Sequence, residues 1–150
     1  QRERFRTHIR AARRCGKPLI VHTRSASDDT LRILREEGAD AVGGVMHCFT
    51  ESWEVAQGAI DLGFKISFSG ILTFKTAAEL RDTASKVPNH ALLIETDSPY
   101  LAPVPMRGRT NEPSFVPLVA ERLAEIRNVS VDAVGELTSR NFFDLFKHAA

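Results

Sequence analysis

The stretch Leu92-Leu93-Ile94-Glu95-Thr96-Asp97-Ser98-Pro99-Tyr100 decides which fold the sequence predicts. It begins as a short apolar run, typical of a strand buried in a parallel sheet, and ends on two carboxylates and a proline. Because side chains alternate along a strand, we expect Glu95 and Asp97 to share one face. Burying an unpaired carboxylate is too costly, so both acids must be hydrogen-bonded, ion-paired or bound to a metal.

Three earlier apolar segments resemble this strand, namely Leu19–His22, Val42–His47 and Phe64–Ser69. The four predicted strands end about 25 residues apart, and helical patterns separate them, which predicts β/α units on a parallel sheet. A closed (β/α)8 barrel of the TIM type needs about 250 residues, so this chain has the material for half of one. The alternative is a small open α/β sheet, but no Gly-rich phosphate fingerprint follows any strand to support a dinucleotide fold.

Helix signals separate and follow these strands. An amphipathic pattern over residues 1–15 predicts a first helix, and Gly16 suits its end. Ser27 is expected to cap the next helix, and Thr76–Glu79 has the spacing of a capping box for a later one. Ser130 is expected to cap the last helix.

The composition excludes several classes of protein. The chain is 43% hydrophobic and 26% charged, which is ordinary for a globular protein. It contains no apolar run near the roughly 20 residues of a membrane span, and no signal-peptide pattern. We therefore expect a soluble, cytoplasmic protein without a membrane partner. Of its two cysteines, Cys15 and Cys48, we expect Cys48 to be a buried structural thiol and not a metal ligand. The net charge of +1 is too small for a surface that coats long nucleic acid, although a local anionic substrate remains open.

His22, His47 and Asp97 stand at the expected carboxyl ends of parallel strands, where β/α barrels place their active sites. Imidazole and carboxylate together suit Zn, Mn or a similar divalent cation. Each residue also has an ordinary explanation, because a histidine after an apolar run is commonly hydrogen-bonded in a core or loop. Asp97 before Ser98-Pro99 also suits a turn. The coincidence of all three at strand ends favours a metal site.

Four nearby side chains are further candidates. Arg24, just beyond the first strand, either meets an anionic group at the metal or forms a surface salt bridge, and the spacing favours neither. Glu95 is expected to lie behind a histidine ligand and orient it. Arg107 and Arg109 lie in a Pro-rich loop, residues 98–113, and either contact phosphates or are ordinary solvated charges.

Five segments closely resemble motifs of the TatD family of metal-dependent deoxyribonucleases, which belongs to the amidohydrolase-like metal barrels. They are Val21–Arg24, His47–Thr50, Phe68–Gly70, Glu95–Pro103 and Asn111–Pro113. They occur in the same order and with compatible spacing over essentially the whole chain. The resemblance implies that His22, His47 and Asp97 match metal ligands of the family. It also implies that Arg24 lies in the substrate pocket.

The family completes its site with a His-x-His motif on the first strand and a glutamate on the fourth, and this sequence contains no His-x-His. We therefore interpret residues 1–150 as the C-terminal portion of a single TatD-type domain. The missing N-terminal half of the barrel is the expected partner that covers the open sheet edges. In the intact protein the resemblance implies two divalent cations, Mg, Mn or Zn.

The first functional hypothesis is a metal-dependent hydrolase of phosphodiester bonds in DNA, which acts on DNA ends or single strands as a 3′–5′ exonuclease. In it Asp97 is a catalytic residue, both metal ligand and proton acceptor. The second is an amidohydrolase-like enzyme that cleaves an amide or ester, because barrels host many chemistries. The third is a non-catalytic half-barrel that needs a partner to fold. We expect this chain alone to be weakly active or inactive.

Overall fold

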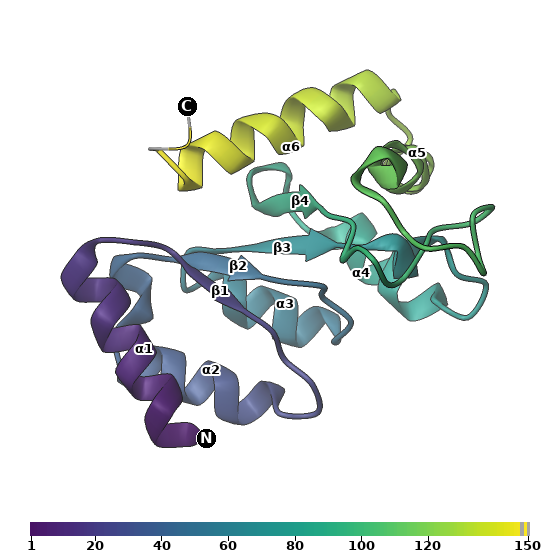
Figure 1. Cartoon of the computed structure of the whole chain (residues 1–150). Helices are drawn as coiled ribbons and strands as arrows, with labels where there is room; N and C mark the ends of the chain where they lie inside the picture. The colour runs from purple at the N-terminus through teal and green to yellow at the C-terminus, as the bar shows by residue number, and fades with distance from the viewer. Residues whose placement is uncertain (148, 150) are drawn as a thin grey trace.

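The computed structural model describes residues 1–147 and residue 149, and its centre is one sheet of four parallel strands (Figure 1). In spatial order they are β1 (Leu19–Val21), β2 (Gly44–Met46), β3 (Phe64–Phe68) and β4 (Leu92–Ile94). The longer helices are α1 (Arg2–Cys15), α2 (Ser27–Glu36), α3 (Trp53–Ile60), α4 (Ala78–Lys86), α5 (Val116–Arg127) and α6 (Val131–Leu145). Short 3₁₀ helices are η1 (Ala39–Ala41), η2 (Gly70–Thr73), η3 (Asn89–Ala91) and η4 (Pro113–Phe115). This confirms the predicted sheet of β/α units.

The parallel ladder fixes which residues reach the carboxyl edge of the sheet. Neighbouring strands pair directly in chain order. The ladder also continues one residue past two of the strands. The N–H of His47 donates to the carbonyl of Val21 at 2.8 Å, and the N–H of Glu95 donates to the carbonyl of Phe68 at 2.9 Å. His47 and Glu95 are therefore held at the same edge by backbone hydrogen bonds.

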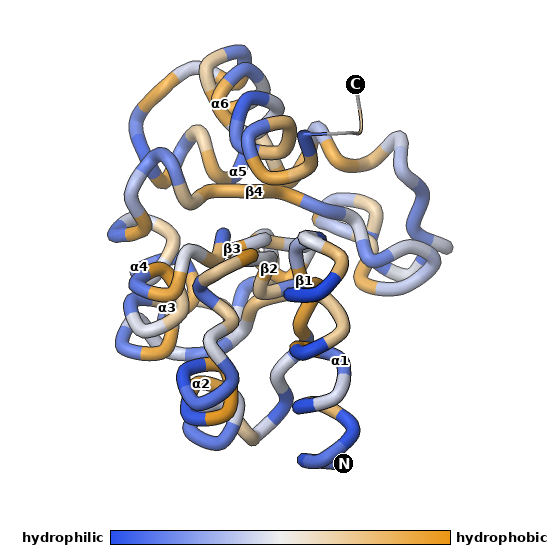
Figure 2. Tube along the Cα trace, turned by 90° about the vertical axis from the view of Figure 1, so that its left-hand side faces the viewer, coloured by the Kyte–Doolittle hydropathy of each residue, from blue (hydrophilic) through white to orange (hydrophobic). Residues whose placement is uncertain are grey.

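The core lies between the sheet and the helices. Helices α1 to α3 lie below the sheet in Figure 1, while α6 lies above β4. The tube in Figure 2 is hydrophobic along β4, which lies between helices α5 and α6 and the rest of the sheet. Large side chains that are fully buried include Ile33, Leu34, Met46, Phe64, Ile66, Phe68, Leu92 and Leu123. Each stabilises the fold by about 1.5–3 kcal/mol relative to an exposed position. The opposite face of β1 is open, since Ile20 is 67% exposed.

Two of the expected helix caps are wrong. Helix α2 begins at Ser27 itself, which is one residue too far along the chain to act as a cap. Helix α4 begins at Ala78, two residues after Thr76, and no side chain caps it. The cap of α6 is confirmed, because Ser130 Oγ accepts the N–H of Ala133 at 3.1 Å. In the described part of the chain, no helix combines the length and apolar character needed to cross a membrane.

An ion-pair cluster joins α1 to the end of α2. Glu37 accepts hydrogen bonds from Arg10 Nε and from Arg6 Nη1, both at 2.7 Å. Those two hydrogen bonds, led by that of Arg10, lower the pKa of Glu37 from 4.5 to about 2. The ionised carboxylate is therefore the form that the folded state favours.

The substitution Glu37→Gln tests this cluster. The pKa of Glu37 is lower in the folded state, so its contribution to stability is complete above pH 4.5 and is lost as the pH falls toward 2. We expect Glu37→Gln to lower Tm near pH 7, and the difference from the wild type to shrink below pH 4.5. Thermal unfolding from pH 7 to pH 3 measures this. Glu121→Gln, at an exposed position of α5, is the control. A difference in Tm that grows in acid would contradict the assignment.

Candidate metal centre

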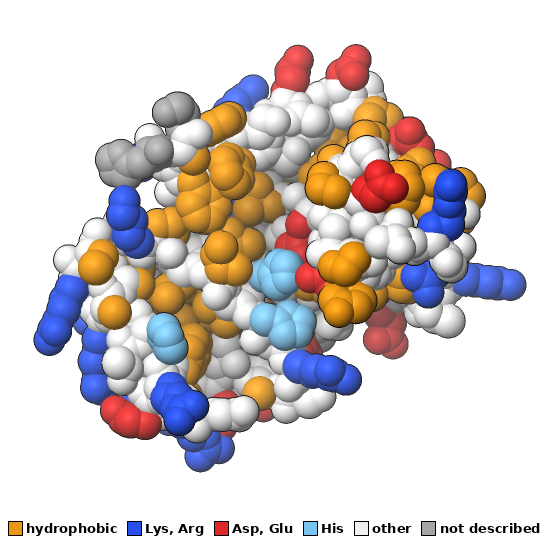
Figure 3. Space-filling view, viewed as in Figure 1, with side chains coloured by type: hydrophobic (Ala, Val, Ile, Leu, Met, Phe, Trp, Pro, Cys, Tyr) orange, Lys and Arg blue, Asp and Glu red, His pale blue; other side chains and the backbone are white. Residues whose placement is uncertain are grey.

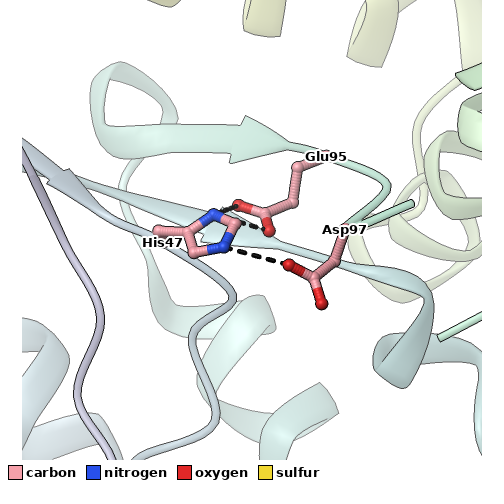
Figure 4. A group of neighbouring side chains, drawn as sticks. All are labelled: His47, Glu95 and Asp97. Carbon is pink, nitrogen blue, oxygen red and sulfur yellow. Dashed lines mark hydrogen bonds and ion pairs between the residues drawn. The ribbon is translucent and has the colours of Figure 1, made fainter. Parts of the chain in front are cut away.

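Three side chains with metal-binding chemistry meet at the carboxyl edge of the sheet. They are His47, directly after β2, and Glu95 and Asp97, which follow β4 (Figure 4). All three are partly buried, and each offers a ligand atom within 4.8 Å of those of the others. Two segments that lie about fifty residues apart in the chain thus converge on one point. In Figure 3, histidine and acidic side chains lie side by side at the margin of an apolar hollow.

Glu95 holds the ring of His47. The Nδ1 atom of His47 donates to Glu95 Oε2 at 3.0 Å, and the backbone N–H of Cys48 donates to the same oxygen at 3.1 Å. The other oxygen, Oε1, is 2.9 Å from Nδ1 but lies outside hydrogen-bonding geometry. It is buried and accepts no hydrogen bond from the residues that the structure describes. A buried carboxylate oxygen in this state is costly unless a cation or another donor reaches it.

The remaining nitrogen of His47 faces a second carboxylate. Its Nε2 atom lies 3.1 Å from Asp97 Oδ1. Both carboxylates can only accept, and a neutral imidazole carries one N–H; the tautomer that suits a metal has this N–H on Nδ1, bonded to Glu95. The lone pair of Nε2 then faces an oxygen of Asp97. A cation between these atoms satisfies both, and imidazole with carboxylates is a donor set for Zn or Mn. The residues present therefore fit a divalent metal.

Asp97 reaches this point by a route that strand geometry does not provide. Strand β4 ends at Ile94, three residues earlier, and Asp97 has a left-handed backbone with φ 61°. Glu95 and Asp97 do lie on the same side, but the expected reason, that both lie on one strand, was wrong. The two carboxylates meet because the chain turns after Thr96, where Tyr100 donates its N–H to the carbonyl of Asp97 at 3.0 Å.

His22 lies beside the group without belonging to it. It follows β1 directly and is exposed. Its Nδ1 is 3.3 Å from the backbone oxygen of His47, and the two rings meet edge to face with centroids 5.9 Å apart. If Nδ1 donates to that carbonyl, the Nε2 lone pair of His22 is left for a ligand. The structure thus brings His22 next to the other proposed ligands, but not into their cluster.

The three arginines differ in their surroundings. Arg24 is exposed in the loop after β1. The nearby acidic residue Asp29, on α2, pairs with Arg2 and Arg32 and not with Arg24. Arg109 is also exposed.

Arg107 packs within its own loop. Its guanidinium lies 4.0 Å from the centre of the Phe74 ring, and its Nη1 donates to the carbonyl of Ala102 at 3.2 Å. A cation stacked on an aromatic ring gains about 0.5–1 kcal/mol at exposed sites. This structural role was not visible in the sequence, because only the path of the loop brings Phe74 beneath Arg107.

Cys48 is buried, as expected for a structural thiol. Burial raises the pKa of its thiol, and the Sγ donates to Ser69 Oγ at 3.4 Å. The neutral thiol therefore packs behind the cluster while its backbone N–H supports Glu95. Ser69, which sequence reasoning did not single out, also caps η2 through the N–H of Ile71.

Comparison with known proteins finds one family. A family profile described as TatD related DNase matches residues 1–147. Escherichia coli strain K12 has a relative named uncharacterized metal-dependent hydrolase YcfH, 55% identical over 97% of this chain and 55% of its own length. A mouse relative, named putative deoxyribonuclease TATDN3, is 33% identical over 97% of this chain and 48% of its own length.

A solved structure agrees with the sequence comparison. The crystal structure of the E. coli TatD homologue YjjV superposes with a TM-score of 0.85 at 30% identity. It covers 93% of this chain and 53% of the YjjV chain. The observed α/β architecture is thus that of TatD barrel proteins. This chain spans about half the length of the curated relatives it matches.

Glu95→Gln tests the metal centre. The amide keeps the volume of the side chain but removes its charge and one of its two acceptor oxygens, so the Nδ1 bond of His47 weakens. Mutation of a residue that hydrogen-bonds a metal ligand typically lowers metal affinity about 10–100-fold. We expect a loss of about that size in the affinity for Mn²⁺. Isothermal titration calorimetry on the intact protein measures it. Glu79→Gln, at an exposed position of α4, is the control. An affinity for Mn²⁺ equal to that of the wild type would refute this role of Glu95.

Proposed function

The chain belongs to the TatD related DNase family, and from that premise we propose that the intact protein is a divalent-metal-dependent hydrolase of phosphodiester bonds in DNA. The observation that carries the proposal is the contact of His47 with Glu95 on one side and Asp97 on the other. The name of the mouse relative supports DNA as the substrate. We further propose that DNA ends or single strands are cleaved from the 3′ end.

His47 and Asp97 would hold the metal through Nε2 and a carboxylate oxygen, with His22 as a further ligand. A bound divalent cation supplies Lewis-acid chemistry, which neutralises phosphate charge and makes water more acidic. Zn, Mn and Mg are all candidates, and imidazole favours the first two. We propose that a second cation binds in the intact protein with ligands from outside this chain.

The residues of this chain have separate tasks in the proposal. Glu95 keeps His47 in one tautomer and orientation through the Nδ1 hydrogen bond. Asp97 faces His47 with Oδ1, which leaves Oδ2 as the oxygen that accepts a proton from the attacking water. Arg24, exposed beyond β1, would bind a phosphate oxygen of the substrate.

Phosphate contacts in the proposal are few and local. The chain carries a net charge of only +1, which favours a few local phosphate contacts over a broad basic surface in this part of the protein. We assign the exposed arginines Arg24, Arg107 and Arg109 to phosphates, and Arg107 is in addition stacked on Phe74. A few local arginines suit binding of the end of a DNA strand better than binding of a long duplex.

Asp97→Asn in the intact protein is the decisive substitution. It keeps the shape of the side chain but removes the anionic ligand and the proton acceptor. We expect the release of nucleotides from single-stranded DNA to fall at least 1,000-fold, by the order of magnitude of removing a ligand together with a general base. Asp82→Asn on α4, whose carboxylate pairs with Lys86, is the matched control. Full turnover by Asp97→Asn would disprove the assignment of Asp97.

The substrate class is tested separately. The wild-type protein, loaded with Mn²⁺, is assayed on single-stranded DNA labelled at its 5′ end and on a panel of amides and esters. A ladder of 5′-labelled products that shortens from the 3′ end is the expected result. Turnover of amides or esters without cleavage of DNA would instead favour the amidohydrolase-like alternative and overturn the proposed substrate.

A further inference from the structure

Asn111 has a buried side-chain amide that hydrogen-bonds the loop containing Asp97. Only 3% of the residue is exposed. Its Nδ2 donates to the carbonyl of Thr96 at 2.7 Å and to that of Tyr100 at 2.6 Å. Its backbone N–H donates to the carbonyl of Pro99 at 3.0 Å. One residue thus ties together three carbonyls that flank Asp97 on both sides.

These bonds fall on a segment that lacks regular secondary structure. Asp97 has φ 61°, a left-handed conformation that a non-glycine residue adopts at a cost of about 1–3 kcal/mol. Surrounding contacts must compensate for that cost. Within the turn, the N–H of Tyr100 donates to the carbonyl of Asp97, and the N–H of Ser98 donates to Thr96 Oγ1 at 3.3 Å. His47 contacts only the Asp97 side chain, whereas the two short bonds from Asn111 restrain the backbone on both sides of Asp97 from outside the turn.

The side chain suits this task because of its chemistry. An amide NH₂ has two hydrogens for two carbonyls, whereas a carboxylate in the same place would face both carbonyls with acceptor oxygens. The amide oxygen is also used, since Oδ1 accepts the N–H of Glu112 at 2.9 Å. Glu112 directly precedes η4, so the side chain of Asn111 bonds the start of η4 on one side and the turn on the other.

We propose that Asn111 is a positioning residue for metal binding: it holds Asp97 in the conformation that directs its carboxylate at His47. The inference deepens the proposed function and rests on it, because it assigns a task to Asn111 within the same site. Asn111 itself does not contact the cluster. Its effect on the metal passes through the backbone on either side of Asp97.

The same strand offers a matched control at its other end. Asn141 on α6 is 2% exposed, and its Nδ2 donates to the carbonyls of Asn89 and Leu92 at 2.6 and 2.8 Å. Both asparagines are thus buried amides that bond two carbonyls next to β4. Asn141 acts at the amino end of β4 and Asn111 at the carboxyl end, near the cluster. Loss of either should lower stability to a similar degree, but only loss of Asn111 should disturb Asp97.

The experiment compares Asn111→Ala with Asn141→Ala in the intact protein. Calorimetric titration with Mn²⁺ gives metal affinity, and amide hydrogen exchange of Asp97, Ser98, Tyr100 and Leu101 in the metal-free protein gives the order of the turn. We expect Asn111→Ala to weaken Mn²⁺ binding about 10–100-fold and to speed exchange of these amides at least tenfold. We expect Asn141→Ala to leave both within about twofold of the wild type, at a similarly lowered Tm.

Each outcome decides the inference. Equal Mn²⁺ affinity and exchange in the two variants would overturn it. Asn111→Asp, which keeps the shape of the side chain but lacks the donors, is the second variant if Asn111→Ala does not fold. If both variants at 111 unfold where Asn141→Ala is folded, Asn111 supports the whole fold and the positioning role is rejected. If the wild type binds none of Mn²⁺, Zn²⁺ and Mg²⁺, the proposed function fails, while exchange in the metal-free protein still decides whether Asn111 orders the turn.

Discussion

The hydrogen bond between Glu95 and His47 is the interaction on which the candidate site depends. It joins the residue after β4 to the residue after β2, across the end of β3. The same carboxylate oxygen accepts the N–H of Cys48, so both the ring of His47 and the backbone next to it are fixed. A carboxylate this well covered needs its partners, because removing one leaves a charge without compensation. The orientation of the histidine follows from the sheet and not from a flexible side chain.

Much of this arrangement was predictable from the sequence, for a physical reason. In a parallel sheet every strand ends at the same edge, so residues that follow apolar runs must meet in space even when they are distant in the chain. That argument placed His22, His47 and Glu95 correctly at the carboxyl edge. Asp97 also lies at this edge, but alternation along the strand was the wrong reason for its orientation, because β4 ends at Ile94 and the turn beyond it is set by tertiary hydrogen bonds. Alternation along a strand says nothing about residues beyond its last ladder bond.

The long loop after β4 shows the same limit. The sequence predicted a Pro-rich loop over residues 98–113 with Arg107 and Arg109 as candidate phosphate contacts, but contacts with η2 that order the loop were not predictable. The N–H of Val104 donates to Thr73 Oγ1 at 2.8 Å, and Arg107 stacks on Phe74. At Gly70 the loop passes so close that a Cβ would lie 2.1 Å from the carbonyl of Leu101. Only glycine is compatible with that approach, which gives the Phe68–Gly70 motif a structural reason.

The contacts that organise the candidate metal site are distinct from the exposed face of the sheet. His47, Glu95 and Asp97 come together through the ladder, the Glu95 carboxylate and the turn after β4, all of which lie within this chain. By contrast, the face of β1 that carries Ile20 is exposed in this chain, and the chain spans only about half the length of its relatives. The contacts that organise the cluster do not involve this exposed face. Binding of a first metal can therefore require fewer residues than hydrolysis of a substrate. The proposed hydrolytic activity belongs to the intact protein.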